Sequence, residues 1–130
     1  MVKYSLEERI ERARQLHKEG YNCSQCVFMV FDDIHNLNTT MAAQVSAGFG
    51  GGVGGQRQVC GAVSGMTLFL GATKYDSPND KATLYKTIQN YCSEFKSLND
   101  SIVCGELLKP GRKPCMSLIE YAITIIHNNL

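Results

Sequence analysis

The sequence predicts an all-α fold, a single compact bundle-like domain of about six helices that spans residues 1–130. Apolar residues recur at helical spacing through most of the chain, and these segments begin at capping signals or end at glycine or proline. No segment of about four to eight residues alternates apolar and polar side chains as a strand does. The length and the 44% hydrophobic content are typical of one domain that buries a core without cross-links.

The first two helices are predicted from their capping boxes. The segment SLEE at residues 5–8 begins the first helix, which continues until Gly20 supplies a stop signal. The segment NCSQ at residues 22–25 repeats the start signal, and an apolar stripe continues the second helix to Ile34. Cys23 is therefore expected to be the first residue of the second helix.

The third and fourth helices flank a glycine-rich loop. Thr39 or Thr40 is expected to cap the third helix, which ends in the loop at residues 48–55. The fourth helix is predicted to start near Cys60 and to stop by Gly71, and its apolar composition indicates a buried core helix. The longest mostly apolar stretch, residues 59–72, is shorter than the roughly 20 residues that a membrane span needs, so a membrane-spanning protein is not expected.

The last third of the chain predicts a long helix, a short one and a final one. The segment SPND at residues 77–80 combines a cap with an early proline and opens a long helix that ends near Ser97. A cap at residues 100–101 begins a short turn or helix, which the Pro-Gly pair at residues 110–111 breaks. Pro114 then opens a final helix rich in isoleucine.

The loop letters GGGVGG at residues 50–55 fit the G-x-G-x-x-G pattern of dinucleotide-binding proteins. That pattern binds phosphate when a strand precedes it, whereas a helix is predicted before it in this chain. The favoured interpretation is structural. The glycines let the backbone turn sharply and present Cys60 at the start of the next helix.

Charge and the N-terminus narrow the classes of function. The net charge is +1 and no run of five like charges occurs, so nucleic acid is not an expected partner. The segment MVKYSLEERIER is charged from its third residue and lacks the apolar part of a secretory signal, so a cytoplasmic location is expected. In that reducing compartment, six cysteines favour redox chemistry or metal binding over structural disulfides.

Position along a helix separates the cysteines into two groups. The partial positive charge at a helix N-terminus lowers the pKa of a thiol there, and the thiolate is the reactive and metal-binding form. Four cysteines fall at predicted helix starts: Cys23, Cys60, Cys104 and Cys115. Cys26 and Cys92 lie deeper in their helices and are interpreted as core residues. The C-x-x-C spacing of Cys26 with Cys23 nevertheless leaves a supporting role for Cys26 open.

Two glycines follow Cys60 at a helical spacing. Gly61 and Gly65 lie four residues apart, so they share one face of the predicted helix. Because glycine has no Cβ, a neighbouring element can approach this face closely. We therefore expect the helix that carries Cys60 to be held tightly.

Residues 60–65 read CGAVSG, a CGAxxG motif that follows the glycine-rich segment. With GYNC at residues 20–23, CGELL at residues 104–108 and Cys115, it resembles the C_GCAxxG_C_C family of putative redox-active proteins. These are small bacterial and archaeal proteins with four characteristic cysteines. The family name writes glycine before cysteine, whereas this chain has the reverse order. The resemblance implies that the family's cysteines correspond to Cys23, Cys60, Cys104 and Cys115, and it suggests a functional link to a transporter.

The leading hypothesis is thiol–disulfide exchange with a redox partner protein, which would make the protein a thiol–disulfide oxidoreductase. Cys60 is expected to be the attacking thiolate, with Cys23 or Cys104 as the resolving thiol. The hypothesis requires that at least one of the four thiols is accessible.

Two alternatives stay open. The four cysteines would also suit zinc or an iron–sulfur cluster, although the long gaps between them lack the close pairs of zinc ribbons. A third role is a thiol sensor or adaptor associated with a transporter. The histidines are expected at the surface or at helix ends rather than as metal ligands: His17, His35 and His127.

Overall fold

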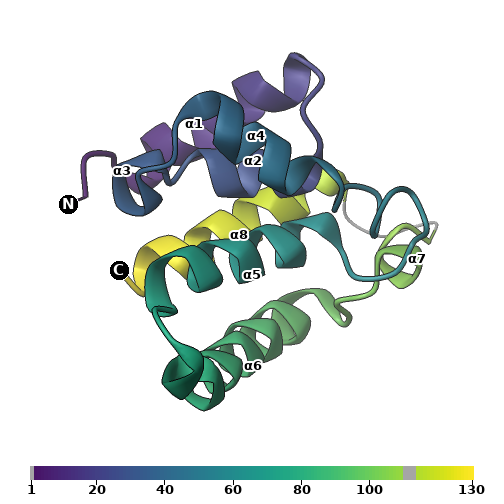
Figure 1. Cartoon of the computed structure of the whole chain (residues 1–130). Coiled ribbons are helices and arrows are strands. Elements are labelled where there is room, and N and C mark those ends of the chain that lie inside the picture. The colour runs from purple at the N-terminus through teal and green to yellow at the C-terminus, as the bar shows by residue number, and fades with distance from the viewer. Residues whose placement is uncertain (1, 110–113) are drawn as a thin grey trace.

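The computed structural model describes residues 2–109 and 114–130, and within these ranges the chain is helical with no strand (Figure 1). The predicted all-α fold is confirmed. The helices are α1 (Leu6–Lys18), α2 (Cys23–Met29), α3 (Asp32–His35), α4 (Thr39–Ala47), α5 (Gly61–Lys74), the 3-10 helix η1 (Pro78–Asp80), α6 (Lys81–Asn99), α7 (Cys104–Leu107) and α8 (Cys115–Asn128). Six of the described α-helices have seven or more residues, in agreement with the predicted number.

The helices form three tiers in Figure 1, with α1 to α4 above, α5 and α8 in the middle, and α6 below. Helix α5 contacts α2, α6 and α8, which places it at the centre of the molecule. Helix α1 packs on α2 and α8, and α4 packs on α2. Helix α6 packs on α5 and α8 from one side, and most of its other side chains are exposed.

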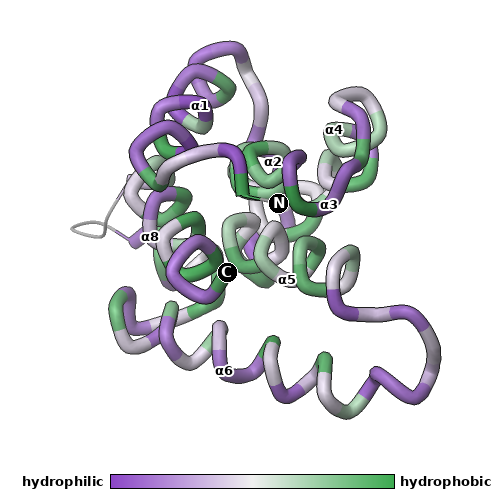
Figure 2. The backbone as a smooth tube through the Cα atoms, turned by 90° about the vertical axis from the view of Figure 1, so that its left-hand side faces the viewer, coloured by the Kyte–Doolittle hydropathy of each residue, from purple (hydrophilic) through white to green (hydrophobic). Residues whose placement is uncertain are grey.

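The core lies between α2, α5 and α8. In Figure 2, the backbones of these three helices lie close together and carry green, hydrophobic stretches. Large side chains that are fully buried there include Phe28, Phe31, Met66, Leu70, Ile119 and Ile123. The prediction that residues 59–72 contain a buried core helix is therefore confirmed.

A buried arginine explains why the second predicted helix is divided. Arg9 donates from Nη1 to the Val30 carbonyl at 2.6 Å, and its two terminal nitrogens donate to the Asp33 carboxylate at 2.8 Å each. The Ile34 N–H, which would bond the Val30 carbonyl in a continuous helix, donates to Phe31 O instead. The sequence predicted one helix to Ile34, whereas the chain forms α2 and the short α3.

Other helix boundaries also differ from the prediction. Helix α7 begins at Cys104 after Val103 and without a side-chain cap, whereas a cap at residues 100–101 was expected. The predicted long helix begins with the 3-10 turn η1 before α6.

Asn38 caps α4, since its side-chain oxygen accepts a backbone N–H at 2.8 Å, whereas Thr39 or Thr40 was expected to do so. Helix α5 continues past Gly71, because a single glycine inside a packed helix costs only about 1 kcal/mol. The predicted break at residues 110–111 lies outside the described residues.

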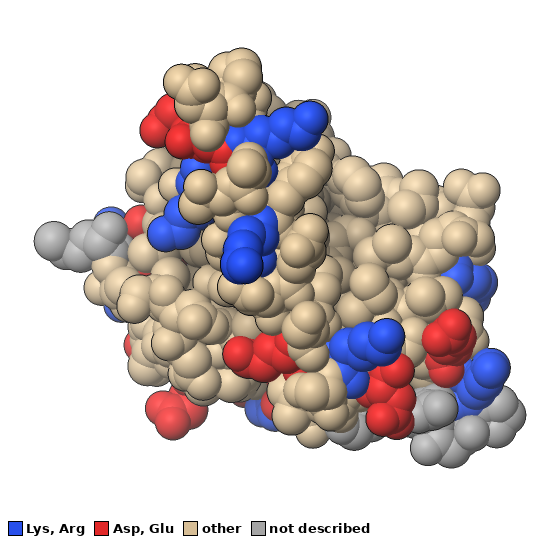
Figure 3. All heavy atoms as spheres, turned by 90° about the horizontal axis from the view of Figure 1, so that it is seen from below, with Lys and Arg blue, Asp and Glu red and all other residues tan. Residues whose placement is uncertain are grey.

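The surface below α6 carries charges of both signs. Figure 3 shows basic and acidic side chains interspersed there, with no broad patch of one sign among the described residues of this face. None of the helices in residues 2–109 and 114–130 combines the length and the apolar character that crossing a bilayer requires.

Candidate functional site

One small pocket collects four cysteines that lie far apart in the sequence. Its lining residues come from the beginning of α2, from the glycine-rich loop, and from α5, α7 and α8: Cys23, Gly51, Arg57, Cys60, Gly61, Cys104, Leu107, Leu108, Cys115 and Leu118. Its volume is about 60 Å³, which leaves room for only a small number of atoms. Helix α7 and the first turns of α5 and α8 meet at the right of Figure 1. The four cysteines are the four that the sequence predicts at helix starts.

The capping box of α2 brings Cys23 to the pocket. The Gln25 N–H donates to Asn22 Oδ1 at 3.0 Å, and the Asn22 N–H donates to Gln25 Oε1 at 3.0 Å. Asn22 also donates from Nδ2 to the Ala47 carbonyl at 2.8 Å, which ties the start of α2 to the end of α4. The predicted helix start at Cys23 is therefore confirmed.

Gly61 and Gly65 let α5 approach α2 closely, as their spacing predicts. A Cβ atom added at Gly61 would collide with Cys23 Sγ. A Cβ atom added at Gly65 would lie 2.8 Å from Val27 Cβ and 3.0 Å from a backbone oxygen of α2. The bare glycine face is thus what allows the sulfur of Cys23 to lie against the first turn of α5.

The glycine-rich loop turns back on itself before α5. Several of its residues have positive φ, a conformation that glycine adopts readily: Gly51, Gly52, Gly54 and Gly55. The Arg57 N–H donates to Gly51 O at 2.9 Å, and the Gln58 N–H donates to Gly52 O at 3.0 Å. A Cβ atom at Gly52 would lie 2.5 Å from the Gln58 nitrogen. Because the loop follows α4 rather than a strand, the structural interpretation of its glycines fits better than dinucleotide binding.

The segment after this loop pairs with the segment before α7. The Cys60 N–H donates to Ile102 O at 2.8 Å, and the Cys104 N–H donates to Gln58 O at 2.6 Å. These two hydrogen bonds hold the backbones at Cys60 and Cys104 beside each other. Nothing local in the sequence marks this pairing, because the two segments are far apart in the chain.

Burial decides the protonation of Cys60. The residue is 4% exposed, and burial raises the pKa of its thiol to about 12. Hydrogen bonds from the Ala62 and Val63 N–H groups lower this pKa, while Cys23 and Cys104 raise it further. Burial therefore works against the low pKa expected for Cys60, whose role as the attacking thiolate stays a prediction. The helix start supplies N–H donors as predicted, but the lost hydration outweighs them.

The other pocket cysteines differ in exposure. Cys23 and Cys115 are half-buried, whereas Cys104 is 7% exposed. Burial raises the pKa of Cys115, and the nearby thiols of Cys23 and Cys104 raise it further. The positive charge of Arg57 acts in the opposite direction and lowers it. Two of the four cysteines are thus partly exposed, and exchange requires at least one accessible thiol.

The two cysteines predicted to lie in the core are outside the pocket. Cys26 is fully buried, its Sγ donates to Tyr21 O at 3.7 Å, and burial followed by the nearby Cys23 raises its pKa to about 12. Cys92 is half-buried on α6, where burial raises its pKa. The C-x-x-C pair is therefore divided, with Cys23 in the pocket and Cys26 in the core.

Sequence reasoning missed Arg57. Its Nη1 donates to Cys104 Sγ at 3.8 Å, so it brings a positive charge to the thiols. An arginine between the glycine-rich loop and the CGAxxG motif was the signal available. That signal is weak, because a charged residue in a loop usually points to solvent.

The four cysteines are also the donor set that the sequence proposes for zinc or an iron–sulfur cluster. Within residues 2–109 and 114–130, no three His, Cys, Asp or Glu side chains lie in an arrangement that could hold a metal ion. His35 and His127 lie at helix ends, as expected, but His35 is buried and stacks on Phe28, and His127 accepts a hydrogen bond from Arg9. Metal binding by the four cysteines stays a prediction.

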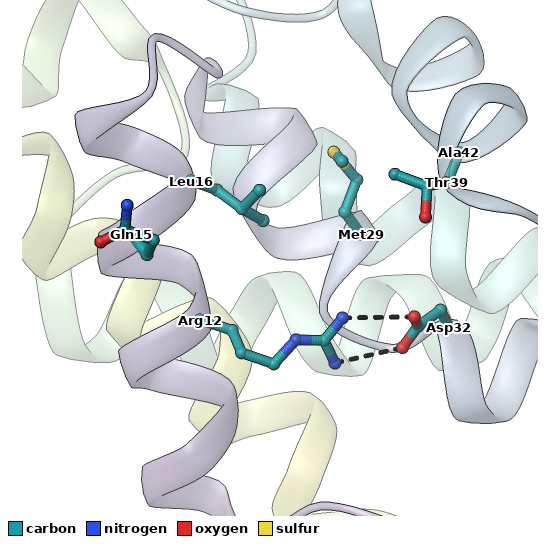
Figure 4. A pocket seen from close by; sticks show the side chains of 7 residues that line it. All are labelled: Arg12, Gln15, Leu16, Met29, Asp32, Thr39 and Ala42. Carbon is teal, nitrogen blue, oxygen red and sulfur yellow. Dashed lines mark hydrogen bonds and ion pairs between the residues drawn. The ribbon is translucent and has the colours of Figure 1, made fainter.

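A larger hollow of about 220 Å³ lies elsewhere, between α1 and α4. It is lined by Arg12, Gln15, Leu16, Met29, Asp32, Thr39 and Ala42, and so by no cysteine. Figure 4 shows that the Arg12 guanidinium bonds both carboxylate oxygens of Asp32, at 3.1 and 3.2 Å. The two charged residues of this hollow therefore pair with each other. Because the hollow has no cysteine in its lining, the thiol pocket is the better candidate for redox chemistry.

Comparisons with known proteins place the chain in a family. A relative from Archaeoglobus fulgidus, named "Uncharacterized protein", is 26% identical over 144 residues, which cover 95% of this chain and 94% of the relative. No solved structure matches the chain. A family model described as "Putative redox-active protein (C_GCAxxG_C_C)" matches residues 21–129, a range that contains all six cysteines. Because that match runs from just before α2 through α8, the chain belongs to the C_GCAxxG_C_C family of putative redox-active proteins.

Proposed function

We propose that the protein carries out thiol–disulfide exchange with Cys23 as the attacking sulfur. The observation that carries this proposal is the convergence of four cysteines from distant parts of the chain on one small pocket. Exchange needs an attacking and a resolving thiol within reach of each other, and a shared pocket provides such neighbours. The description of the family as redox-active agrees with this chemistry.

Accessibility favours Cys23 and Cys115 over the two buried thiols, Cys60 and Cys104. Cys60 and Cys104 are buried, so a partner disulfide meets Cys23 or Cys115 first. The pKa of Cys115 is raised by burial and by two neighbouring thiols, which leaves a smaller fraction of it as thiolate. The sulfur of Cys23 packs against Gly61, where the absence of a side chain makes room for it.

The reaction takes its oxidising equivalents from the disulfide of a partner. The Cys23 thiolate attacks one sulfur of that disulfide, a new S–S bond forms, and the other partner sulfur leaves as a thiolate that takes up a proton. A second pocket thiol then loses its proton and attacks Cys23 Sγ. The internal disulfide closes and the remaining partner sulfur leaves as a thiol. Two protein thiols are oxidised while one partner disulfide is reduced.

The test begins with protein purified without oxygen, reductants or chelators. The reduced protein is mixed with oxidised glutathione, and intact mass and peptide mapping follow each cysteine with time. We expect a transient glutathione adduct at Cys23, followed by an internal disulfide between Cys23 and another pocket cysteine. The Cys23→Ser variant should form neither product, and the matched Cys92→Ser variant should form both.

Two results would overturn the proposal. One is oxidation of the Cys23→Ser variant at the wild-type rate. The other is a stoichiometric metal ion or iron–sulfur cluster in the anaerobic protein that protects the four pocket cysteines from alkylation, which would support the metal-binding alternative.

The identity of the redox partner is part of the same proposal. The pocket is too small for a folded element, so a partner would present only the sulfurs of its disulfide. A role as a transporter-associated sensor or adaptor and a cytoplasmic location stay predictions.

A further inference from the structure

Arg57 is held in place by its backbone. Its N–H donates to Gly51 O at 2.9 Å, and its carbonyl accepts from the Gly105 N–H at 3.1 Å. Its φ of 62° lies in the left-handed region, which residues other than glycine adopt uncommonly. A strained backbone persists only where its surroundings enforce it, and such positions gather at functional sites. The fold therefore fixes where this side chain begins.

The side chain of Arg57 passes between two glycines to reach a sulfur. A Cβ atom at Gly105 would lie 3.4 Å from Arg57 Cβ, and one at Gly51 would lie 3.9 Å from Arg57 Nη1. Beyond them, Nη1 donates to Cys104 Sγ at 3.8 Å. No salt bridge joins Arg57 to a carboxylate in residues 2–109 and 114–130. The guanidinium therefore faces the thiol of Cys104 and is not paired with an acidic side chain of the described residues.

Among the described residues that line the pocket, no group other than Arg57 brings a positive charge to Cys104. The other groups that face Cys104 are the three other pocket thiols, from α2, from the start of α5 and from α8. Glu106, the nearest carboxylate along the chain, accepts a hydrogen bond from Ser101 Oγ at 2.7 Å. Among the described residues that line the pocket, Arg57 alone carries a formal charge.

We propose that Arg57 stabilises negative charge on Cys104 Sγ and thereby makes Cys104 the resolving thiol. This inference rests on the proposed exchange reaction and names a residue that tunes it. Cys104 is 7% exposed, so water gives its sulfur little help, whereas a guanidinium is always charged and forms a strong hydrogen bond to an anion. In the second step, the Cys104 thiolate attacks Cys23 Sγ, their S–S bond forms, and the partner sulfur leaves with the bonding pair and takes up a proton.

The test uses the reduced, folded protein and does not require exchange. Iodoacetamide is added, and peptide mapping gives the alkylation rate at Cys104. Replacing Arg57 by Gln uncovers the sulfur, so a purely steric role predicts faster alkylation. If the variant instead loses a charged hydrogen bond to the thiolate, alkylation at Cys104 should become slower, by roughly tenfold to hundredfold. Arg57→Lys keeps the charge and should recover most of the rate, and Arg14→Gln, the same change on the surface of α1, should have no effect.

A second measurement needs no variant at all. In the wild-type protein, the positive charge should make anionic iodoacetate react at Cys104 faster, relative to neutral iodoacetamide, than it does at Cys92. This comparison decides the matter if Arg57→Gln fails to fold.

Several outcomes would overturn the role of Arg57. These are equal or faster alkylation in Arg57→Gln, a Lys variant as slow as the Gln variant, an equal effect of Arg14→Gln, or equal reagent preference at the two cysteines. If glutathione exchange fails while Arg57→Gln slows alkylation, the charge effect at Cys104 stands and the exchange reaction does not.

Discussion

Gly61 and Gly71 lie on the same helix but in opposite surroundings. A Cβ atom at Gly61 would collide with Cys23 Sγ and would also lie 3.2 Å from two backbone atoms, whereas nothing lies within 4 Å of one at Gly71. We expect Gly61→Ala to lower the free energy of unfolding by about 1–3 kcal/mol through overpacking. Gly71→Ala should raise it by about 0.5–1 kcal/mol, because alanine favours the helix. Urea unfolding measures both, and equal effects would contradict the close contact of α5 with Cys23.

Arg9 and Asp33 form an ion pair in which both side chains are fully buried. Burial alone raises the pKa of Asp33, but hydrogen bonds from Arg9 and from the Lys3 N–H outweigh it, so the pKa is lowered. The pair therefore stabilises the fold above the ordinary carboxyl value of 3.8, and this stability is lost as the pH falls below it. Asp33→Asn leaves a buried charge unpaired and should destabilise by about 3–5 kcal/mol in urea unfolding.

The matched control for that prediction is the exposed pair on the surface of α1. Arg14 Nη2 lies 3.1 Å from Glu120 Oε1, with both side chains partly in solvent. Glu120→Gln should change the free energy of unfolding by only about 0–1 kcal/mol. Similar losses at the two acidic positions would show that the Arg9 pair is hydrated in solution.

Single residues also show where sequence reasoning succeeded at the site. The helix start at Cys23 was predictable because the capping box of α2 acts over a few positions. Cys60 and Cys104 also lie at helix starts, but neither start has a side-chain cap, and the cap expected before Cys104 at residues 100–101 does not form. The burial that raises the pKa of Cys60 was not predictable, since it depends on elements that are distant in the sequence. Arg57 was missed for the same reason, because its proximity to Cys104 follows from the pairing of two remote segments.

Helix α3 shows how a tertiary contact overrides an apolar stripe. The stripe through Ile34 is continuous, but the buried side chain of Arg9 captures the Val30 carbonyl and divides the helix. The end of α3 is held by its last residue, His35. Nε2 of its ring lies 2.9 Å from the Phe28 carbonyl oxygen, and Nδ1 accepts a hydrogen bond from the Leu37 N–H. These contacts fit a neutral imidazole with its proton on Nε2.

The stability of α3 should therefore depend on pH. Burial lowers the pKa of His35 below its ordinary 6.5, although Phe28 O and two carboxylates oppose this, and the pKa of His127 is lowered as well. The unfolded chain then binds protons more readily, so stability is full above the ordinary value and declines as the pH falls through it. We expect a smaller free energy of unfolding at about pH 5.5 than at about pH 7.5. His35→Gln should reduce this difference in the free energy of unfolding. An unchanged difference would show that the protonation of His35 does not cause it.

The assembly of the helices explains why the fold class was predictable and the pocket was not. Helical spacing and caps identify α1, α2, α5 and α8 one at a time, and each has an apolar face that must be covered. Which faces meet depends on close approaches such as that of α5 with α2. The pocket forms where several of these packings meet, so its four thiols could be named from the sequence without their shared position being known.

Helix α6 is attached to the rest of the molecule by a narrow strip. Figure 2 shows it running beside the other helices, and Phe95 and Asn99 are the two buried residues among its nineteen. Elements with few buried contacts open locally without global unfolding. Amide hydrogens in α6 should therefore exchange with solvent faster than those in α5, most of all in its first half. Hydrogen-exchange mass spectrometry measures this difference.

Phe95→Ala should turn that difference into a local release of α6. Truncating a buried phenylalanine costs about 3–5 kcal/mol, and here the loss falls on a helix with only one other buried residue. Tyr85→Ala, on the same helix at a side chain 52% exposed, serves as the control and should leave exchange unchanged. The pocket should survive in both variants, because Cys104 is held by its own hydrogen bond to Gln58. If α5 and α6 lose protection together in Phe95→Ala, the two helices form one cooperative unit, and α6 then supports the core that positions the thiols.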